Sequence, residues 1–406
     1  MTKTLAGTPD EQPRKRKKTP KLRDGVVKRG STWSYVIRVR DPETGESRPR
    51  WVSGFPTEDE AKAARDEARV KARRGEYIDR NATTVAEYLA DWIEGHAVEI
   101  KPHTLKGYRD MIRLYIVPRI GKVRLQALRP SAITKLYRDL LTSGGRTGGP
   151  LAANTVKHAH IVLRKALTDA VLVDELIPNN PAERAKLPRV HATEPGMIWT
   201  AAQLRAFLET ASDHRLFAFF RLAAYTGARR GELLNLRWRD VDLDTPQIHI
   251  RGSAAVIDRQ RVEGTTKSGR SRMVSLDAGT VRVLKAHRAR QDADKLKLGE
   301  NWKGKDTYVF TTGWGEPVFP DTLSSLMPKL IEAHNKKTPG LPHARLHDLR
   351  HIHATTLLLA GVPVHVVAAR LGHADPAITL RVYAHVIHEQ AATAADVFAD
   401  AVKNAA

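Results

Sequence analysis

Prolines recur through residues 176–196, and they limit how this chain of 406 residues can fold more than any other feature does. They are Pro178, Pro181, Pro188 and Pro195. Each proline lacks a backbone N–H and biases the residue before it toward an extended conformation, so neither a helix nor a central strand can run through the segment. Such a stretch is typical of a linker between domains. We therefore expect separate domains on either side of a linker over 178–196.

A mixed, mostly helical domain is predicted after the linker, over 197–388. Thr200 and Gln203 form a capping box at its first helix, and the apolar run over 217–225 predicts a buried helix that ends at Gly227. The further elements expected are a short helix after Arg229, a strand over 248–250, a hairpin over 261–276 with its turn at or near Lys267, and helices over 278–298 and 322–335.

An all-helical domain is predicted before the linker, over 81–177. Thr84 and Glu87 form a capping box, and apolar residues follow at helical steps. Further helices are expected over 104–115, from Ser131 and from Asn154, the last two because Ser and Asn are favoured caps of helix N-termini. A four-helix unit does not by itself indicate a function.

A small domain of one sheet and one helix is predicted over 25–80. Apolar and polar residues alternate from Trp33 to Arg40, the period of a half-buried strand, and a return strand is expected over 48–52. A capping box at Thr57 opens a basic helix. The arginines expected on the open face of the sheet are Arg38, Arg40, Arg48 and Arg50. They fit the major groove of DNA, although they could instead simply keep an exposed face soluble.

The charge of the chain predicts a polyanionic partner. Its formal net charge is +22 and its pI is about 10.2, a basic excess most often associated with nucleic acid. Residues 1–24 contain the basic run Arg14–Lys18. We expect a solvated, disordered tail there, an arm that follows a phosphate backbone, or a tail that is both.

Composition disfavours several other classes of protein. The chain has no cysteine, which excludes disulfides, thiolate metal sites and a Cys nucleophile. No apolar run approaches the ~18 residues that a membrane span needs, and no hydrophobic signal region is present. We therefore expect a soluble protein of the cytoplasm without a membrane partner.

The stretch over 343–385 carries the side chains that most suggest chemistry. His347 and Arg350 lie three apart on a predicted helix and share a face, and a second short helix, capped by Asp375, carries Tyr383. An arginine can hold a phosphate bidentately, a histidine can move protons near neutral pH, and a tyrosine bears a nucleophilic hydroxyl. This set predicts phosphoryl transfer without a metal or a cofactor.

Metal binding is the alternative for these histidines. His347 and His351 lie four apart on the predicted helix and could together bind zinc. Spacing places no third ligand, and no carboxylate occupies the position that the zinc-protease motif requires. We therefore expect His351 and His353 to pack or to form hydrogen bonds.

Three segments of the C-terminal half together resemble the tyrosine recombinases, the phage integrase family. They are TGARRGELLNLRW over 226–238, TKSGRSRMVSL over 266–276, and HDLRH over 347–351 followed by LGHADPAITLRVYAH over 371–385. The resemblance covers about 198–390 by motif. The helical domain is similar to the family's core-binding domain, and the sheet-plus-helix domain to its arm-type DNA-binding domain. This implies a multidomain, mainly α fold with a mixed α+β, mostly helical catalytic domain.

The resemblance also implies a role for each chemistry-bearing residue. Arg229 and Arg350 hold the scissile phosphodiester, Tyr383 is the nucleophile, His347 is the base or a proton-moving partner, His373 donates to a phosphate oxygen, and Lys267 protonates the 5′-hydroxyl leaving group. Glu232 lies three residues after Arg229, and we expect it to support Arg229 through an ion pair with the guanidinium. Lys267 is open to a second interpretation, contact with a backbone phosphate. The intermediate implied is a 3′-phosphotyrosyl bond, whose energy is kept, so neither ATP nor a metal is required.

The function implied is site-specific recombination of the kind a phage or an integrative element uses. Its partners would be double-stranded DNA attachment sites, a homotetramer on DNA, a DNA-bending host factor and an excision factor. A C-terminal helix over 389–406 would dock on a neighbouring subunit or on its own domain. The alternatives are a type IB topoisomerase, which shares the tyrosine chemistry, and a DNA-binding protein with a decayed active site.

Overall fold

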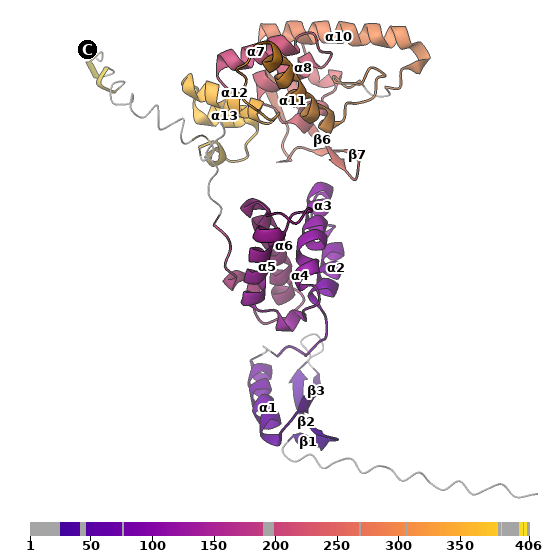
Figure 1. Ribbon diagram of the computed structural model, residues 1–406, viewed down its shortest axis with the longest axis vertical. Helices are drawn as coiled ribbons and strands as arrows, with labels where there is room; N and C mark the ends of the chain where they lie inside the picture. Colours follow the sequence, from indigo (N-terminus) through magenta and orange to yellow (C-terminus); the bar gives the residue numbers. More distant parts are fainter. Residues whose placement is uncertain are drawn as a thin grey trace, which may run out of the picture. The chain divides into compact units, whose positions relative to one another are not determined.

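The computed structural model describes residues 25–40, 46–74, 77–189, 199–267, 269–304, 307–380, 383, 398–400 and 402–403. Over these residues the fold is mostly helical with small antiparallel sheets, as the sequence predicts. The chain forms two compact units that divide after residue 190 (Figure 1). The predicted tail over 1–24 and most of the predicted helix over 389–406 lie outside the described residues, as do residues 41–45 between two predicted strands.

A three-stranded sheet and one helix begin the first unit. Strands β1 (Val26–Arg29), β2 (Thr32–Arg40) and β3 (Ser47–Phe55) pair antiparallel in the order β1-β2-β3. Helix α1 (Glu58–Arg73) packs on one face, and the Thr57 side chain accepts a hydrogen bond from the Glu60 backbone N–H at 3.3 Å. The core between them consists of Val26, Tyr35, Ile37, Val52, Ala61 and Ala68.

The register of β2 and β3 divides the arginines between the two faces of the sheet. Arg50 lies opposite Ile37, a core residue beneath α1, and residues directly opposite on antiparallel strands point to the same face. Arg38 alternates with Ile37 and therefore points to the other face. The expectation that all these arginines share the open face is wrong, because alternation along one strand does not fix its register against the next.

The other two arginines of the sheet lie near the same end of the ladder. Arg48 is opposite Val39 and shares the side of Arg50, while the backbone of Arg40 pairs with Ser47. Arg38 donates two hydrogen bonds to Ser47, one to the side chain at 3.1 Å and one to the carbonyl at 2.8 Å. Arg50 forms an ion pair with Asp79 at 3.0 Å.

Helices with a core of their own complete the first unit. The elements are α2 (Val85–His96), α3 (Pro102–Met111), the π turn η1 (Ile112–Ile116), α4 (Val117–Ile120), η2 (Leu125–Ala127), α5 (Pro130–Ser143), α6 (Ala153–Leu172) and η3 (Pro181–Arg184). The predicted capping box at Thr84 is present, and the Glu87 carboxylate accepts a hydrogen bond from the Thr84 backbone N–H at 2.8 Å. Residues from Val85 to Ala182 form the shared apolar core.

Two predicted caps and the start of the predicted linker differ in the structure. Helix α5 begins one residue before Ser131, with Pro130 at its first position, and α6 begins before Asn154, so neither side chain caps a helix. Residues 181–184 form η3, and Ala182 is fully buried against the helical core. Pro181 is favoured at a helix start. Residues 181–184 therefore pack against the helical domain, and the extended linker does not begin at Pro178 as predicted.

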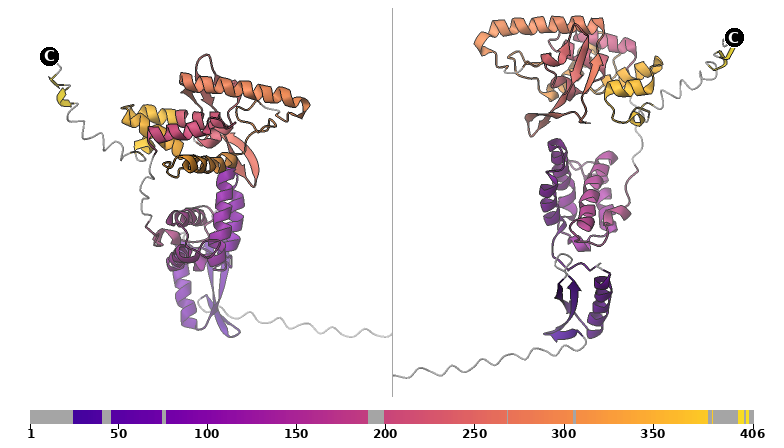
Figure 2. Two further views of the ribbon diagram at one scale, coloured as in Figure 1. Left: turned by 45° about the horizontal axis from the view of Figure 1, so that its top comes forward. Right: turned by 180° about the vertical axis from the view of Figure 1, so that it is seen from behind.

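The second unit has a core of helices around small sheets. Its first elements are α7 (Ala201–Ala211), α8 (Phe217–Thr226), α9 (Arg230–Leu234), η4 (Trp238–Asp240), β4 (Val241–Asp242), β5 (Gln247–Ile250), β6 (Gly252–Ile257), β7 (Gln260–Thr265) and β8 (Arg272–Ser275). They are followed by α10 (Ala278–Leu298), η5 (Gly299–Asn301), α11 (Pro320–Lys337), α12 (Asp348–Leu359) and α13 (Val364–Leu371). Helix α12 packs against α8 and α13, as both figures show (Figure 1 and Figure 2).

The predicted hairpin over 261–276 does not form. Strand β7 pairs with β6 through a two-residue turn at Asp258 and Arg259, both with positive φ, whereas β8 pairs with β5 in another sheet. Two-residue turns of that conformation match the twist of antiparallel strands. Lys267 therefore lies on a connection between two sheets, not at the turn of a hairpin.

Candidate active site

A tight turn places Arg229 at the start of α9. Helix α8 ends at Gly227, whose φ is 64°, and a Cβ there would lie 2.6 Å from Leu371 and 2.8 Å from His353. Only glycine fits, because the conformation is left-handed and the space is filled. The backbone N–H and the Nη1 of Arg229 both donate to Glu232, each at 2.9 Å.

Glu232 holds a second arginine as well. Its carboxylate is 1% exposed and accepts hydrogen bonds from Arg272 at 2.7 and 3.1 Å. Burial by itself raises the pKa of this carboxyl, but hydrogen bonds and charge from Arg272 and Arg229 outweigh it and lower the pKa. The carboxylate is therefore ionised, and it orients two guanidinium groups. Arg272 was not predicted as a site residue; its signal was its place in the segment TKSGRSRMVSL.

Arg350 is the most buried of these arginines, at 4% exposed. Its Nη1 donates to the Gly227 carbonyl at 2.7 Å and its Nη2 to the Leu371 carbonyl at 2.8 Å. Burial, and then the charge of Arg229, lowers its pKa to about 9, which leaves it cationic at neutral pH. A guanidinium has five N–H donors, so donors remain beyond these two bonds.

Two histidines lie in the electric field of the arginines. His347 directly precedes α12, whereas His373 follows the left-handed Gly372 and bonds through Nδ1 to Thr379 Oγ1 at 2.6 Å. Burial lowers the pKa of each to about 4, reinforced by His351 and then Arg350 for His347, and by Arg350 and then Arg229 for His373. Both rings are therefore neutral at pH 7 and can donate one N–H.

Tyr383 packs in a small apolar cluster with α12 and α13 and is 2% exposed. Its hydroxyl lies 2.9 Å from His351 Nδ1. Burial raises its pKa to about 12, while Arg350 acts in the opposite direction. His351, expected only to pack or to form a hydrogen bond, thus contacts the predicted nucleophile. The signal for it was the spacing His347-x-x-x-His351 on one helix face.

Lys267 lies on the connection between β7 and β8. It is exposed, and within the described part of the chain its side chain forms no hydrogen bond or ion pair. Its neighbour Thr266 is buried and donates to the Arg270 carbonyl at 2.7 Å, which fixes the base of the connection.

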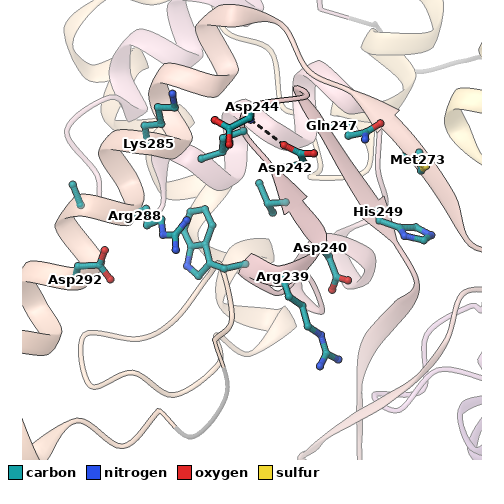
Figure 3. Close-up of a pocket in the computed structure, with 14 residues that line it drawn as sticks. Arg239, Asp240, Asp242, Asp244, Gln247, His249, Met273, Lys285, Arg288 and Asp292 are labelled. Carbon is teal, nitrogen blue, oxygen red and sulfur yellow. Dashed lines mark hydrogen bonds between the residues drawn. The ribbon is translucent and has the colours of Figure 1, made fainter.

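One further cavity, beside α10, is lined by none of the predicted site residues. This cavity of about 800 Å³ lies between η4, β4, β5 and α10, and Figure 3 shows Asp240, Asp242 and Asp244 on one side of it, with Lys285 and Arg288 on the other. Over the described residues no group of three or more His, Asp or Glu is placed to hold a metal ion. In the same part of the chain, no helix has the length and apolarity needed to cross a membrane.

Family models match three parts of the chain. The phage integrase family matches residues 199–390, the N-terminal SAM-like domain of phage integrases matches 84–141, and an arm DNA-binding domain matches 26–72. These three ranges fall within the three parts that have separate cores.

Relatives align over nearly the whole chain. A protein named tyrosine recombinase XerC-like, from Caldanaerobacter subterraneus subsp. tengcongensis, is 28% identical over 92% of this chain and 97% of its own length. The ICEBs1 integrase of Bacillus subtilis is 28% identical over 89% of this chain and 95% of its own length.

Solved structures share the fold. The Tn1549 transposon integrase in complex with transposon right end DNA aligns with a TM-score of 0.64 at 21% identity, over 78% of this chain and 99% of that one. A lambda integrase tetramer bound to a Holliday junction aligns with a TM-score of 0.55 at 18% identity, over 90% and 96%. The matched family models and the aligned relatives lead to one conclusion: this chain belongs to the phage integrase family of tyrosine recombinases.

Proposed function

We propose that the chain is a site-specific DNA recombinase that cleaves and rejoins double-stranded DNA through a 3′-phosphotyrosyl intermediate, to integrate or excise a mobile element. The observation that carries this proposal is the convergence of Arg229, His347, Arg350, His373 and Tyr383. These residues come from the turn after α8, from the start of α12 and from the segment after α13. Arg350 is close enough to each of the other four for charge to affect a pKa: Arg229 lowers the pKa of Arg350, and Arg350 lowers those of His347, His373 and Tyr383.

The arrangement suits an anionic, five-coordinate phosphorus. Two fixed guanidinium groups match the non-bridging oxygens, and neutral His347 and His373 can each donate a further hydrogen bond. Because Glu232 and backbone carbonyls hold the arginines before DNA arrives, little reorganisation is needed in the transition state. Tyr383 is the proposed nucleophile, and Glu232 the residue that supports Arg229.

Lys267 is the proposed general acid for the 5′-hydroxyl leaving group. Its exposed place between β7 and β8 supports a role in which the connection closes over bound DNA. A lysine that protonates a leaving group must reach the reacting oxygen. Contact with a backbone phosphate remains its alternative.

The partners proposed are DNA attachment sites bound by 25–80 and 81–177 together with the catalytic domain over 197–388. Arg38, Arg40, Arg48 and Arg50 are proposed DNA contacts of the first domain. A homotetramer is supported by the lambda integrase tetramer on a Holliday junction, whose fold this chain shares. A bending factor, an excision factor and a site in the bacterial cytoplasm belong to the same proposal.

The C-terminal segment over 389–406 is proposed to join neighbouring subunits. An apolar cavity of about 810 Å³ between α7, α8, α12 and α13 is lined by Leu204, Leu208, Phe217, Leu357, Val362 and Val366. A helix with Ala392, Ala395, Val397 and Phe398 on one side would fill it with apolar groups. Ending the chain after residue 388 should leave DNA binding by one subunit intact and prevent tetramers on DNA, as mass photometry would show.

Covalent trapping tests the proposed chemistry. Full-length protein would be incubated, without Mg²⁺ or ATP, with nicked duplexes that it selects from a library with a randomised centre. A protein–DNA adduct on a denaturing gel is expected, and Tyr383→Phe should abolish it. Exchange of strands between two copies of the selected site separates a recombinase from a type IB topoisomerase, and specific binding without an adduct would indicate a decayed active site.

A further inference from the structure

The hydroxyl of Tyr383 contacts a histidine other than the one that the resemblance marks as the base. His351 Nδ1 lies 2.9 Å from the phenolic oxygen, and the two rings lie 5.8 Å apart between centroids. Within the described part of the chain, the Tyr383 hydroxyl forms its hydrogen bond with His351. His347 instead meets the ring of His351 edge-on, at 5.1 Å.

The protonation states of the pair assign the direction of this hydrogen bond. Burial raises the pKa of Tyr383 to about 12, so the phenol keeps its proton. Burial also lowers the pKa of His351, with Asp348 acting against it, so the imidazole is neutral at pH 7. The phenol therefore donates, Nδ1 accepts, and the ring proton sits on Nε2.

The charged surroundings of His351 keep its basic nitrogen available. The titratable and charged groups that face it are Arg345, His347, Asp348, Arg350, His373 and Tyr383. The two arginines disfavour a resting positive charge on the ring, while Asp348 would stabilise the imidazolium once it forms.

We propose that His351 is the general base that takes the proton of Tyr383 as the phenolic oxygen attacks the scissile phosphorus. This rests on the proposed function. The O–H bond of Tyr383 breaks and its proton passes to Nδ1, while the phenolic oxygen bonds to phosphorus. The bond from phosphorus to the 5′ oxygen then breaks, and that oxygen is protonated by the acid assigned to Lys267. Rejoining reverses each step and returns the proton to Tyr383.

Single-turnover cleavage of the selected nicked duplex, measured from pH 5.5 to 9.5, tests this assignment. His351→Asn places an amide oxygen near the position of Nδ1 but removes the basicity, so it separates proton transfer from positioning. We expect it to lower the rate at pH 7 by ~100-fold, the lower range for a general base. Its rate should rise tenfold per pH unit where the unchanged protein levels off. His365→Asn, on an exposed histidine of α13, is the matched control and should change neither.

A substrate with sulfur in place of the bridging 5′ oxygen distinguishes base from acid. A thiolate leaves without protonation, so this substrate should restore cleavage by Lys267→Ala and not by His351→Asn. Restored cleavage by His351→Asn, or a rate and pH profile equal to those of the unchanged protein, would overturn the assignment. Either result leaves the Tyr383-dependent adduct in place, whereas an unchanged protein that forms no adduct overturns both the assignment and the proposed function.

Discussion

Arginines are prominent in both the N-terminal sheet and the catalytic unit, and the two groups are held in opposite ways. Around Glu232 the side chains of Arg229 and Arg272 are 25% and 11% exposed, and their guanidinium groups bond to one buried carboxylate. On the sheet, Arg48 and Arg50 are more than half exposed, and their ion pairs are with surface carboxylates. Burial and fixed partners suit transition-state recognition, while exposed, salt-screened arginines suit contact with a DNA backbone.

Among the substitutions that test this difference between the two groups of arginines, replacing Arg350 should have the largest effect, on the rate of DNA cleavage. Arg350→Lys keeps a positive charge but loses the planar fork that bonds two carbonyls, so we expect cleavage to slow by ~10²–10³-fold. DNA affinity should change little. Single-turnover adduct formation at saturating DNA measures this, and a rate within tenfold of the unchanged protein would mean that charge alone suffices.

Removing the charge of Glu232 should have the next largest effect, on stability. Glu232→Gln leaves two half-buried arginines without their buried carboxylate, and we expect the catalytic unit to lose ~3 kcal/mol of unfolding free energy. Glu46→Gln, at the exposed pair with Arg48, is the control and should change stability by less than ~0.5 kcal/mol. Urea unfolding compares them, and equal losses would contradict the distinction drawn between buried and exposed pairs.

Acid should weaken the catalytic unit and spare the N-terminal sheet. The pKa values of His353 and His373 fall to about 4 in the folded protein, below the ordinary value of 6.5. At pH values between these the unfolded chain binds more protons, so this contribution to stability is complete above pH 6.5 and is lost as pH falls toward 4. Residues 25–80 contain no histidine. Hydrogen exchange at pH 7.5 and 5.0 should show faster opening in the catalytic unit at the lower pH and no such change in residues 25–80.

The smallest effect is expected from the sheet. Arg38→Ala should lower the slope of log affinity against log salt by about 1 while cleavage at saturating DNA is unchanged. Arg48→Ala tests the opposite face, because the register separates the two side chains. A change from Arg38 alone would place DNA on the open face. Equal changes would mean that DNA meets the end of the ladder instead.

Much of the architecture could be predicted because it depends on local sequence. The capping boxes at Thr84 and Thr200 are present, and α8 ends at Gly227 as expected. These features require only neighbouring residues, so the local pattern is sufficient. The caps expected at Ser131 and Asn154 were wrong, because α5 begins at Pro130 and α6 at Ala153, with Arg129 and Ala152 at their N-cap positions.

The pairing of strands could not be predicted from the local sequence pattern. Strands β7 and β8 were expected to pair with each other, but each pairs with a strand earlier in the chain, β6 and β5. The faces of Arg38 and Arg50 depended on the register between β2 and β3 in the same way. Pairing is decided by burial against the rest of the fold, which a strand's own sequence does not contain.

By itself the sequence determined the family, through ordered motifs, and the residue types that phosphoryl transfer needs. Only the tertiary structure decided which atoms meet. Spacing put His347 and Arg350 on one helix face, but the contacts of Tyr383 with His351 and of Arg272 with Glu232 join residues distant in the chain. Such contacts form because packing around a shared core fixes distances that no interval along the chain specifies.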